Sequence, residues 1–208
     1  MASNSWYKNF AELSKSEREG VSYQCRVKRR QSKFVIIAPH GGGIEPGTSE
    51  IACSIAGMVF SYYVFDGLRQ KGNELLHMAS TVFDEPRCLK LVNASQVVIA
   101  IHGCTGDEQT IYLGGLHEEL KTRLIESLLN AGFDARLAGR DYAGLQLENI
   151  CNRGRLGRGV QLEITEGLRR AMFKGLNRPG RKTTTEVFQK FVVLIHKELV
   201  TVTKENGA

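Results

Sequence analysis

The sequence lacks the cysteine spacings that mark disulfide frameworks and structural zinc sites. Its cysteines are odd in number, and no two of them form a Cys-x-x-Cys pair. Scattered cysteines of this kind are typical of reduced thiols that pack in a core. The sequence therefore predicts neither a cross-linked fold nor a zinc knuckle. The cysteines are Cys25, Cys53, Cys88, Cys104 and Cys151.

Targeting segments and long hydrophobic runs are also missing. Residues 1–19 are mostly polar and show no basic segment followed by an apolar one, as a secretory signal would require. No apolar run approaches the roughly 18 residues that a membrane span needs. We therefore expect a protein that is made in the cytoplasm without a signal peptide and has no membrane partner.

Three common catalytic and nucleotide-binding motifs are absent as well. The chain has no Gly-x-Ser-x-Gly, no Gly-x-x-x-x-Gly-Lys-Ser/Thr and no Gly-x-Gly-x-x-Gly after a strand, which argues against a serine hydrolase elbow and a phosphate loop. The glycine triplet at 41–43 is followed by Ile44 and Glu45 rather than by a helix start. This triplet is therefore not expected to bind phosphate.

The composition that remains is that of a globular protein with a basic surface. Of 208 residues, 42% are hydrophobic and 24% charged, which suits one domain with a substantial core. The net charge of +6 attracts polyanions of any kind. It therefore favours an anionic partner but does not identify which one.

Apolar segments of strand and helix character alternate along the chain. Such alternation predicts an α/β three-layer sandwich, with a mostly parallel or mixed sheet and helices on both faces. We expect one catalytic domain over residues 1–208, with 1–24 as a peripheral arm. The expected strands are 34–39, 61–65, 74–78, 97–101, 133–137 and 160–165, and the expected helices are 10–18, 48–59, 86–94, 117–131 and 185–201.

Two of the most apolar strands end in histidine. Residues 34–39 lead into His40, with Glu45 five residues later, and residues 97–101 lead into His102. Parallel strands place such residues at one edge of the sheet, where α/β proteins bind ligands. Two histidines and one acid, with a position left for water, are a common catalytic zinc set. The pattern predicts a zinc site made of His40, Glu45 and His102.

A general base is also needed, and Glu163 is the candidate. It lies on the polar face of the alternating strand 160–165, directly after an Arg-rich loop, and a carboxylate can take a proton from water and pass it to a leaving group. Glu166 is the alternative. An ion pair between Glu163 and a neighbouring arginine is the competing structural interpretation.

The remaining candidate ligands are ranked below this set. His77 is a second candidate for the same cleft, whereas His117 and His196 lie on expected helix faces and are assigned to structure. Cys104 is a rival ligand, because it follows His102 by two residues.

These residues also carry a family resemblance. The run from Ala38 to Thr48 (APHGGGIEPGT), the segment 80–86 (STVFDEP), the strand end at 101–103 and the stretch 152–163 resemble the phage poly-γ-glutamate hydrolases and their bacterial relatives. That family is related to zinc carboxypeptidases and N-formylglutamate amidohydrolases. The resemblance covers roughly residues 30–200.

The resemblance implies a zinc-carboxypeptidase-like fold, one zinc ion on His40, Glu45 and His102, and Glu163 as the base. It implies cleavage of γ-glutamyl amide bonds in poly-γ-glutamate, by a phage protein that is released on host lysis and degrades a capsule polymer. Asn152, Arg153 and Arg158 are the candidate substrate-binding residues, and a monomer is expected. Classical carboxypeptidases place two residues between the first histidine and the glutamate, whereas four intervene here.

Two alternatives stay open. A zinc amidase or carboxypeptidase could act instead on cell-wall peptides or N-acyl amino acids. A non-enzymatic, basic nucleic-acid-binding protein would bind DNA with a steep salt dependence and without regard to zinc.

Overall fold

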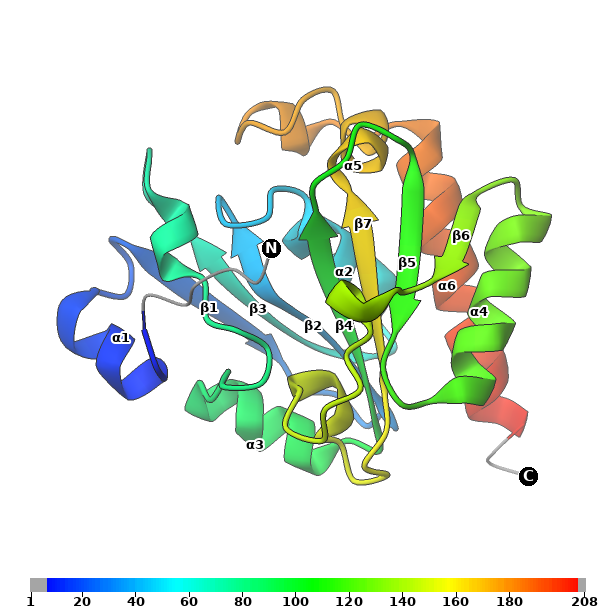
Figure 1. The fold of residues 1–208 in the computed structure, drawn as a ribbon, viewed down its shortest axis with the longest axis horizontal. Coiled ribbons are helices and arrows are strands. Elements are labelled where there is room, and N and C mark those ends of the chain that lie inside the picture. Colours follow the sequence, from blue (N-terminus) through cyan, green and yellow to red (C-terminus); the bar gives the residue numbers. More distant parts are fainter. Residues whose placement is uncertain (1–6, 206–208) are drawn as a thin grey trace.

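The computed structural model describes residues 7–205, and it is built around one seven-stranded sheet (Figure 1). The strands are β1 (Tyr23–Lys28), β2 (Phe34–Gly42), β3 (Ser61–Gly67), β4 (Val97–Cys104), β5 (Thr110–Gly114), β6 (Asp134–Leu137) and β7 (Val160–Thr165). Their order across the sheet is β1-β3-β2-β4-β7-β5-β6. The centre is parallel, whereas β1 pairs antiparallel with β3 and β5 antiparallel with β7. The predicted mixed α/β architecture is confirmed.

Helices cover both faces of the sheet. Residues from α2, α4, α5 and α6 share one hydrophobic cluster with the sheet, and residues from α1 and α3 share the other. The helices are α1 (Phe10–Ser16), α2 (Thr48–Ala56), α3 (Pro86–Ala94), α4 (Glu118–Asn130), α5 (Glu166–Met172) and α6 (Glu186–Glu205), with short 3-10 turns η1 (Asn73–Leu76), η2 (Arg140–Tyr142), η3 (Ile150–Asn152) and η4 (Gly180–Lys182). Among residues 7–205, no helix combines the length and apolar character needed to cross a membrane.

The central strand β2 shows why the sheet needs two layers of cover. Its side chains alternate, so that Phe34 and Ile36 join one hydrophobic cluster and Val35 and Ile37 join the other. Every residue of β2 is buried, as expected for a parallel strand covered on both faces. This burial fixes the direction in which the side chain of His40, near the end of β2, points.

One expected strand is wrong and two strands were not expected. Residues 74–78 were predicted as a strand, but η1 occupies most of that segment. Gly72 adopts a left-handed conformation, and the Asn73 side chain bonds both the N–H and the carbonyl of Arg69, so the chain turns instead of extending. The unexpected strands are β1, whose residues are mostly exposed, and the five-residue β5.

The described part of the expected amino-terminal arm packs against the domain, while residues 1–6 lie outside the described residues. Leu13 of α1 is fully buried. The backbone N–H of Phe10 donates to Asp84 at 2.6 Å, and the Tyr7 hydroxyl donates to Glu17 at 2.6 Å. From residue 7 onward, this segment is thus attached to the face that carries α3.

Candidate active site

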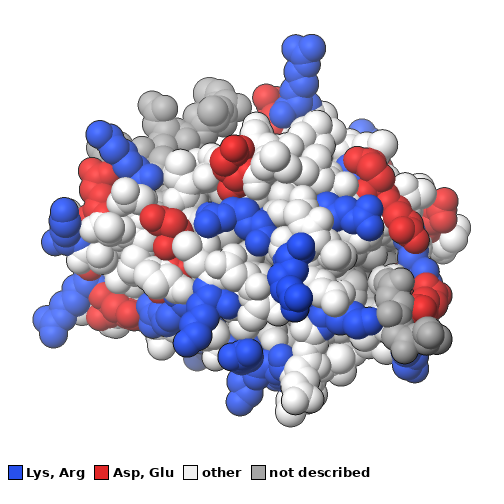
Figure 2. Space-filling model, turned by 90° about the horizontal axis from the view of Figure 1, so that it is seen from below, with Lys and Arg blue, Asp and Glu red and all other residues white. Residues whose placement is uncertain are grey.

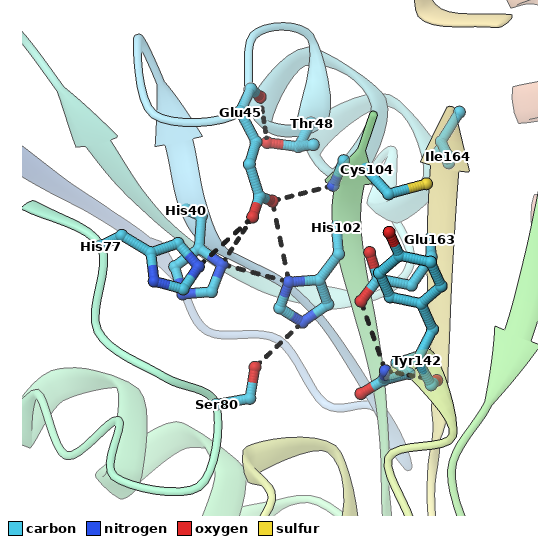
Figure 3. A network of polar contacts seen from close by, with 12 residues as sticks. His40, Glu45, Thr48, His77, Ser80, His102, Cys104, Tyr142, Glu163 and Ile164 are labelled. Atoms are coloured by element: carbon cyan, nitrogen blue, oxygen red, sulfur yellow. Dashed lines mark hydrogen bonds and ion pairs between the residues drawn. The ribbon is translucent and has the colours of Figure 1, made fainter. Parts of the chain in front are cut away.

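Four titratable side chains meet at the carboxyl ends of β2 and β4 (Figure 3). His40 comes from β2, His102 from β4, Glu45 from the loop after β2, and His77 from the segment after η1. The two strand-end histidines are each only 2% exposed. The adjacent pairing of β2 and β4 therefore places both imidazoles in one buried site, as the sequence predicts.

The loop after β2 folds back so that Glu45 reaches the histidines. The backbone N–H of Glu45 donates to the carbonyl of His40 at 2.8 Å. Gly42 makes this return possible: its φ is +65°, and a Cβ at this position would lie 2.6 Å from the Gly67 carbonyl oxygen. The carboxylate is then fixed by the backbone N–H of Gly103, which donates to Oε2 at 2.8 Å. The turn at the glycine triplet thus lets Glu45 reach His40 although four residues lie between them.

Potential ligand atoms of three side chains converge at the centre of the site. Nδ1 of His40 lies 2.9 Å from Oε1 of Glu45 and 3.2 Å from Nδ1 of His102. Nδ1 of His102 lies 3.7 Å from Oε2 of Glu45. Nε2 of His40 lies 2.6 Å from the Met78 carbonyl oxygen. Because a carbonyl can only accept, Nε2 carries the hydrogen and Nδ1 turns its lone pair toward the centre.

This arrangement fits a bound zinc ion. Imidazole nitrogens and a carboxylate oxygen are the ligand types that zinc takes. A lone pair of His40 that faces both the Glu45 carboxylate and a second imidazole requires a proton or a cation between them. The hydrogen bond from the far nitrogen of His40 to a backbone carbonyl is also the kind of contact that orients metal-binding histidines.

His77 offers a second choice for the third ligand. The ligand atoms of His40, Glu45 and His77 all lie within 4.8 Å of one another, and Nε2 of His77 is 3.7 Å from Oε1 of Glu45. Its ring, however, packs against the His40 ring with centroids 3.8 Å apart and planes inclined by 31°. Two overlapping donor sets therefore share His40 and Glu45.

The charges in the site depend on one another. Burial, together with the charge of His77, lowers the pKa of His40 to about 4. Burial alone would raise the pKa of Glu45, but the surrounding histidines, His40 first, hold it well below its ordinary value. Burial also acts to lower the pKa of His102, yet Glu163 and Glu45 raise it overall. His40 is thus neutral and Glu45 ionised near neutral pH.

Glu163 lies beside His102, because these residues are partners in the β4–β7 register. Its carboxylate accepts from Nε2 of Gln161 at 3.3 Å, and the same nitrogen donates to the Tyr142 carbonyl at 2.9 Å. Burial raises the pKa of Glu163 to about 7; Glu45 adds to this effect, whereas His102 opposes it. A buried carboxyl group of this pKa exchanges a proton near neutral pH, as a general base must.

The alternative base and the lower-ranked ligand candidates lie in different environments. Glu166 is the first residue of α5 and forms an ion pair with Arg170 one turn later. Burial raises the pKa of Cys104 to about 12, so its thiol stays protonated. His117 caps α4, and Nδ1 of His196 lies 2.7 Å from a backbone carbonyl of α2. Both histidines thus have contacts within the fold, and their assignment to structure stays a prediction.

Asn152, a predicted substrate-binding residue, is buried in the loop before β7. Its Oδ1 accepts from the backbone N–H groups of Leu116 and Gly159, and its Nδ2 donates to the carbonyls of Gly144 and Gln146. These four bonds give Asn152 a role in holding the loop. Its part in substrate binding stays a prediction.

The two predicted substrate-binding arginines lie at different places. Arg153 is half-buried, and its Nη1 donates to the Phe83 carbonyl at 3.1 Å. Arg158 is exposed and precedes β7, about 16 Å along the extended chain from Glu163. The structure therefore does not bring Arg158 to the carboxyl ends of the strands, and its role in binding also stays a prediction.

Two residues near the site were not singled out from the sequence. Gln161 could have been found, because it lies two residues before Glu163 and so faces the same side of the strand. The sequence around Arg169 contains no comparable pattern. This residue belongs to α5, a helix that was not expected from the sequence, and only the fold brings it behind β4.

Comparisons with known proteins show the family of this chain. The chain is 37% identical over 196 residues to UPF0714 protein YndL of Bacillus subtilis (strain 168), which covers 93% of this chain and 77% of the relative. A solved structure of a bacteriophage poly-gamma-glutamate hydrolase matches 97% of this chain and 100% of its own, with a TM-score of 0.94 and 32% identity. The structure named "YNDL-apo (Zinc-free)" matches 96% and 99%, with a TM-score of 0.91 and 36% identity. The model of the poly-gamma-glutamate hydrolase family matches residues 7–194, and the chain belongs to that family.

Proposed function

We propose that this protein is a zinc-dependent hydrolase that cleaves γ-glutamyl amide bonds in poly-γ-glutamate. The observation that carries the proposal is the convergence of Nδ1 of His40, Nδ1 of His102 and the Glu45 carboxylate beside a buried Glu163 with a pKa of about 7. Family membership supports the substrate, and the name of the zinc-free YndL structure supports the choice of metal.

His40, Glu45 and His102 would hold the zinc ion. When bound, zinc would polarise the amide carbonyl and make water in the site more acidic. Glu163 accepts a proton from the attacking water as the new C–O bond forms, and later donates a proton to the nitrogen as the C–N bond breaks. The backbone N–H of Gly103 and the Met78 carbonyl keep Glu45 and His40 in place for this reaction.

Removal of the metal tests this function. Chelation is expected to abolish the shortening of poly-γ-glutamate, because the proposed reaction needs the ion to polarise the amide carbonyl and to make water more acidic. Added zinc is expected to restore the activity. Polymer length and newly formed amines are measured against time, with circular dichroism as the control for folding. A rapid fall in length indicates cleavage within the chain.

The same assay separates the proposal from its rivals. Full activity after metal content has fallen below detection would exclude zinc dependence. If the protein cleaves N-acyl amino acids or cell-wall peptides in a zinc-dependent way but does not shorten poly-γ-glutamate, it is instead an amidase for those smaller substrates.

A further inference from the structure

Arg169 is a buried cation at the carboxyl ends of the central strands. It lies in α5, directly after β7, and is only 4% exposed. Each of its three nitrogens donates to a backbone carbonyl: Nε to Ile164 at 3.0 Å, Nη1 to Pro46 at 2.9 Å and Nη2 to Cys104 at 2.9 Å. One side chain thus joins three segments that are far apart in the sequence.

These carbonyls are close to the residues of the candidate site. The first belongs to the residue directly after Glu163, the second to the residue directly after Glu45, and the third lies two residues after His102. A shift of Arg169 would therefore move two candidate ligands and the candidate base relative to one another.

The backbone of β4 makes room for this side chain. A Cβ on Gly103 would lie 2.7 Å from Cζ of Arg169, and also within 3.1 Å of its Nη1. Gly103 also donates its N–H to the Glu45 carboxylate. The glycine after His102 therefore serves both the ligand and the arginine behind it.

We propose that Arg169 is a positioning residue that sets the spacing of Glu45, His102 and Glu163, and thereby the affinity of the site for zinc. A guanidinium group is planar and donates in several fixed directions, whereas a lysine ammonium is a compact charge on a flexible chain. Arg169 acts through the backbone and does not itself contact substrate. The inference depends on the proposed metal site.

The test is the zinc affinity of Arg169→Lys, measured by competition with a chromophoric chelator. We expect an affinity about 10- to 100-fold lower than in the unchanged protein, the usual effect of losing a contact that orients metal ligands. Arg181→Lys is the matched control, because Arg181 is also buried and donates to Glu50 and to a backbone carbonyl away from the site. Melting temperatures of both metal-free variants separate affinity from stability.

The outcomes distinguish this inference from the proposed function. If the unchanged protein does not bind zinc, the metal site itself is wrong. If it binds zinc and Arg169→Lys binds it equally well, with a stability loss like that of Arg181→Lys, the positioning role is excluded. Should Arg169→Lys not fold, Gly103→Ala is used instead; it displaces the guanidinium, and wild-type zinc affinity in that variant would overturn the inference.

A second, independent observation concerns the opposite end of the sheet. Two cavities of about 500 and 390 Å³ adjoin there and share Gln31, Ser32 and Ala94 in their walls. Arg29 and Arg30 line the first, and Lys33 and Arg155 line the second. Among the described residues, no aspartate or glutamate lines either one.

This basic groove is remote from the candidate active site. It lies at the start of β2, which begins at Phe34, whereas His40 follows six residues later, about 20 Å along the extended strand. Figure 2 views this side of the molecule and shows lysine and arginine side chains spread across it. Arginine binds carboxylates through two parallel hydrogen bonds, and a polymer of γ-linked glutamate presents one carboxylate per residue.

We infer that this groove binds a stretch of the polymer away from the bond that is cut. The inference depends on the proposed substrate. A second attachment point raises the local concentration of a long chain at the active site but gives no benefit to a short oligomer. The groove should therefore affect KM for long polymer and leave kcat/KM for short γ-glutamyl oligomers unchanged.

The test uses the double variant Arg29→Glu/Arg155→Glu, with Lys190→Glu/Lys197→Glu on α6 as the charge-matched control. We expect KM for long polymer to rise about 10-fold in the groove variant only. This is less than the roughly 10²- to 10⁴-fold gain that a linked second site can give, because two of the four basic residues of the groove remain. Binding of long polymer to the same variants is measured on the Glu163→Gln background.

Each result has one interpretation. No polymer binding by Glu163→Gln itself would count against the proposed substrate. Polymer binding that is equally weakened in both double variants, or in neither, would exclude the groove. Loss of DNA binding with unchanged polymer binding in the groove variant would identify a nucleic-acid site instead.

Discussion

Replacing Glu163 with glutamine is expected to lower kcat for γ-glutamyl bond cleavage by about 10²- to 10⁴-fold, the usual contribution of a general base. Glutamine keeps the size of the side chain and can still bond Gln161, but it cannot accept a proton from water. Because Glu163 is not a proposed ligand, zinc content should stay unchanged. Steady-state kinetics and metal analysis of the purified variant measure both quantities.

The stability of the metal-free variant provides the control. Burial raises the pKa of Glu163 from 4.5 to about 7, so between these values the folded chain holds a proton that the unfolded chain has released. The stabilisation from this proton is complete below about pH 4.5 and is lost as the pH rises through 7. The unfolding free energy of Glu163→Gln, relative to the unchanged protein, should be about 3 kcal/mol higher at pH 8 than at pH 4.

Two results would contradict this assignment. A variant that keeps the kcat of the unchanged protein would exclude Glu163 as the base. A difference in unfolding free energy that does not change with pH would show that folding does not raise the pKa of Glu163.

Alanine at His102 is expected to weaken zinc binding by more than about 100-fold and to abolish cleavage. This exceeds the usual effect of changing a residue that only orients the metal ligands. The Nδ1 atom of His102 is 3.2 Å from Nδ1 of His40 and is held by a buried strand. Alanine at His77 is expected to change zinc affinity by less than about 10-fold, because this ring packs against the His40 ring, with centroids 3.8 Å apart. Zinc titration of both variants decides between the two donor sets.

The opposite result has a clear meaning. If His77→Ala loses zinc and His102→Ala keeps it, the metal is held by His40, Glu45 and His77, whose ligand atoms lie within 4.8 Å of one another. Glu163 would then need to be reassigned, because its proposed role depends on its place beside His102.

The strands that carry the candidate site could be predicted because their sequences contain little besides apolar residues. Segments such as 34–39 and 97–101 have no polar residue until the histidine, so strand length and strand end are set by the same pattern. Elements without such a run were not predicted correctly. The strand β1 was not expected, because it is mostly exposed. Residues 74–78 contain two leucines and were expected to form a strand, but they follow a left-handed glycine that turns the chain.

Contacts between distant segments could not be predicted from local patterns. The carbonyl of Met78 contacts His40, and the side chain of Arg169 bonds the residue after Glu45, only because three segments far apart in the sequence meet in space. Likewise, the four hydrogen bonds of the Asn152 amide to the backbone of other segments could not be foreseen from its place in the sequence.

The order of the strands has a consequence for the behaviour of this protein in concentrated solution. The sheet ends in β1 on one side and in β6 on the other, and an edge strand can pair with a strand of another molecule. β1 carries Arg26 and Lys28, and the four-residue β6 carries Asp134 and Arg136. Charged side chains and short length both hinder such pairing. The edges of the sheet therefore protect the protein against aggregation by strand addition.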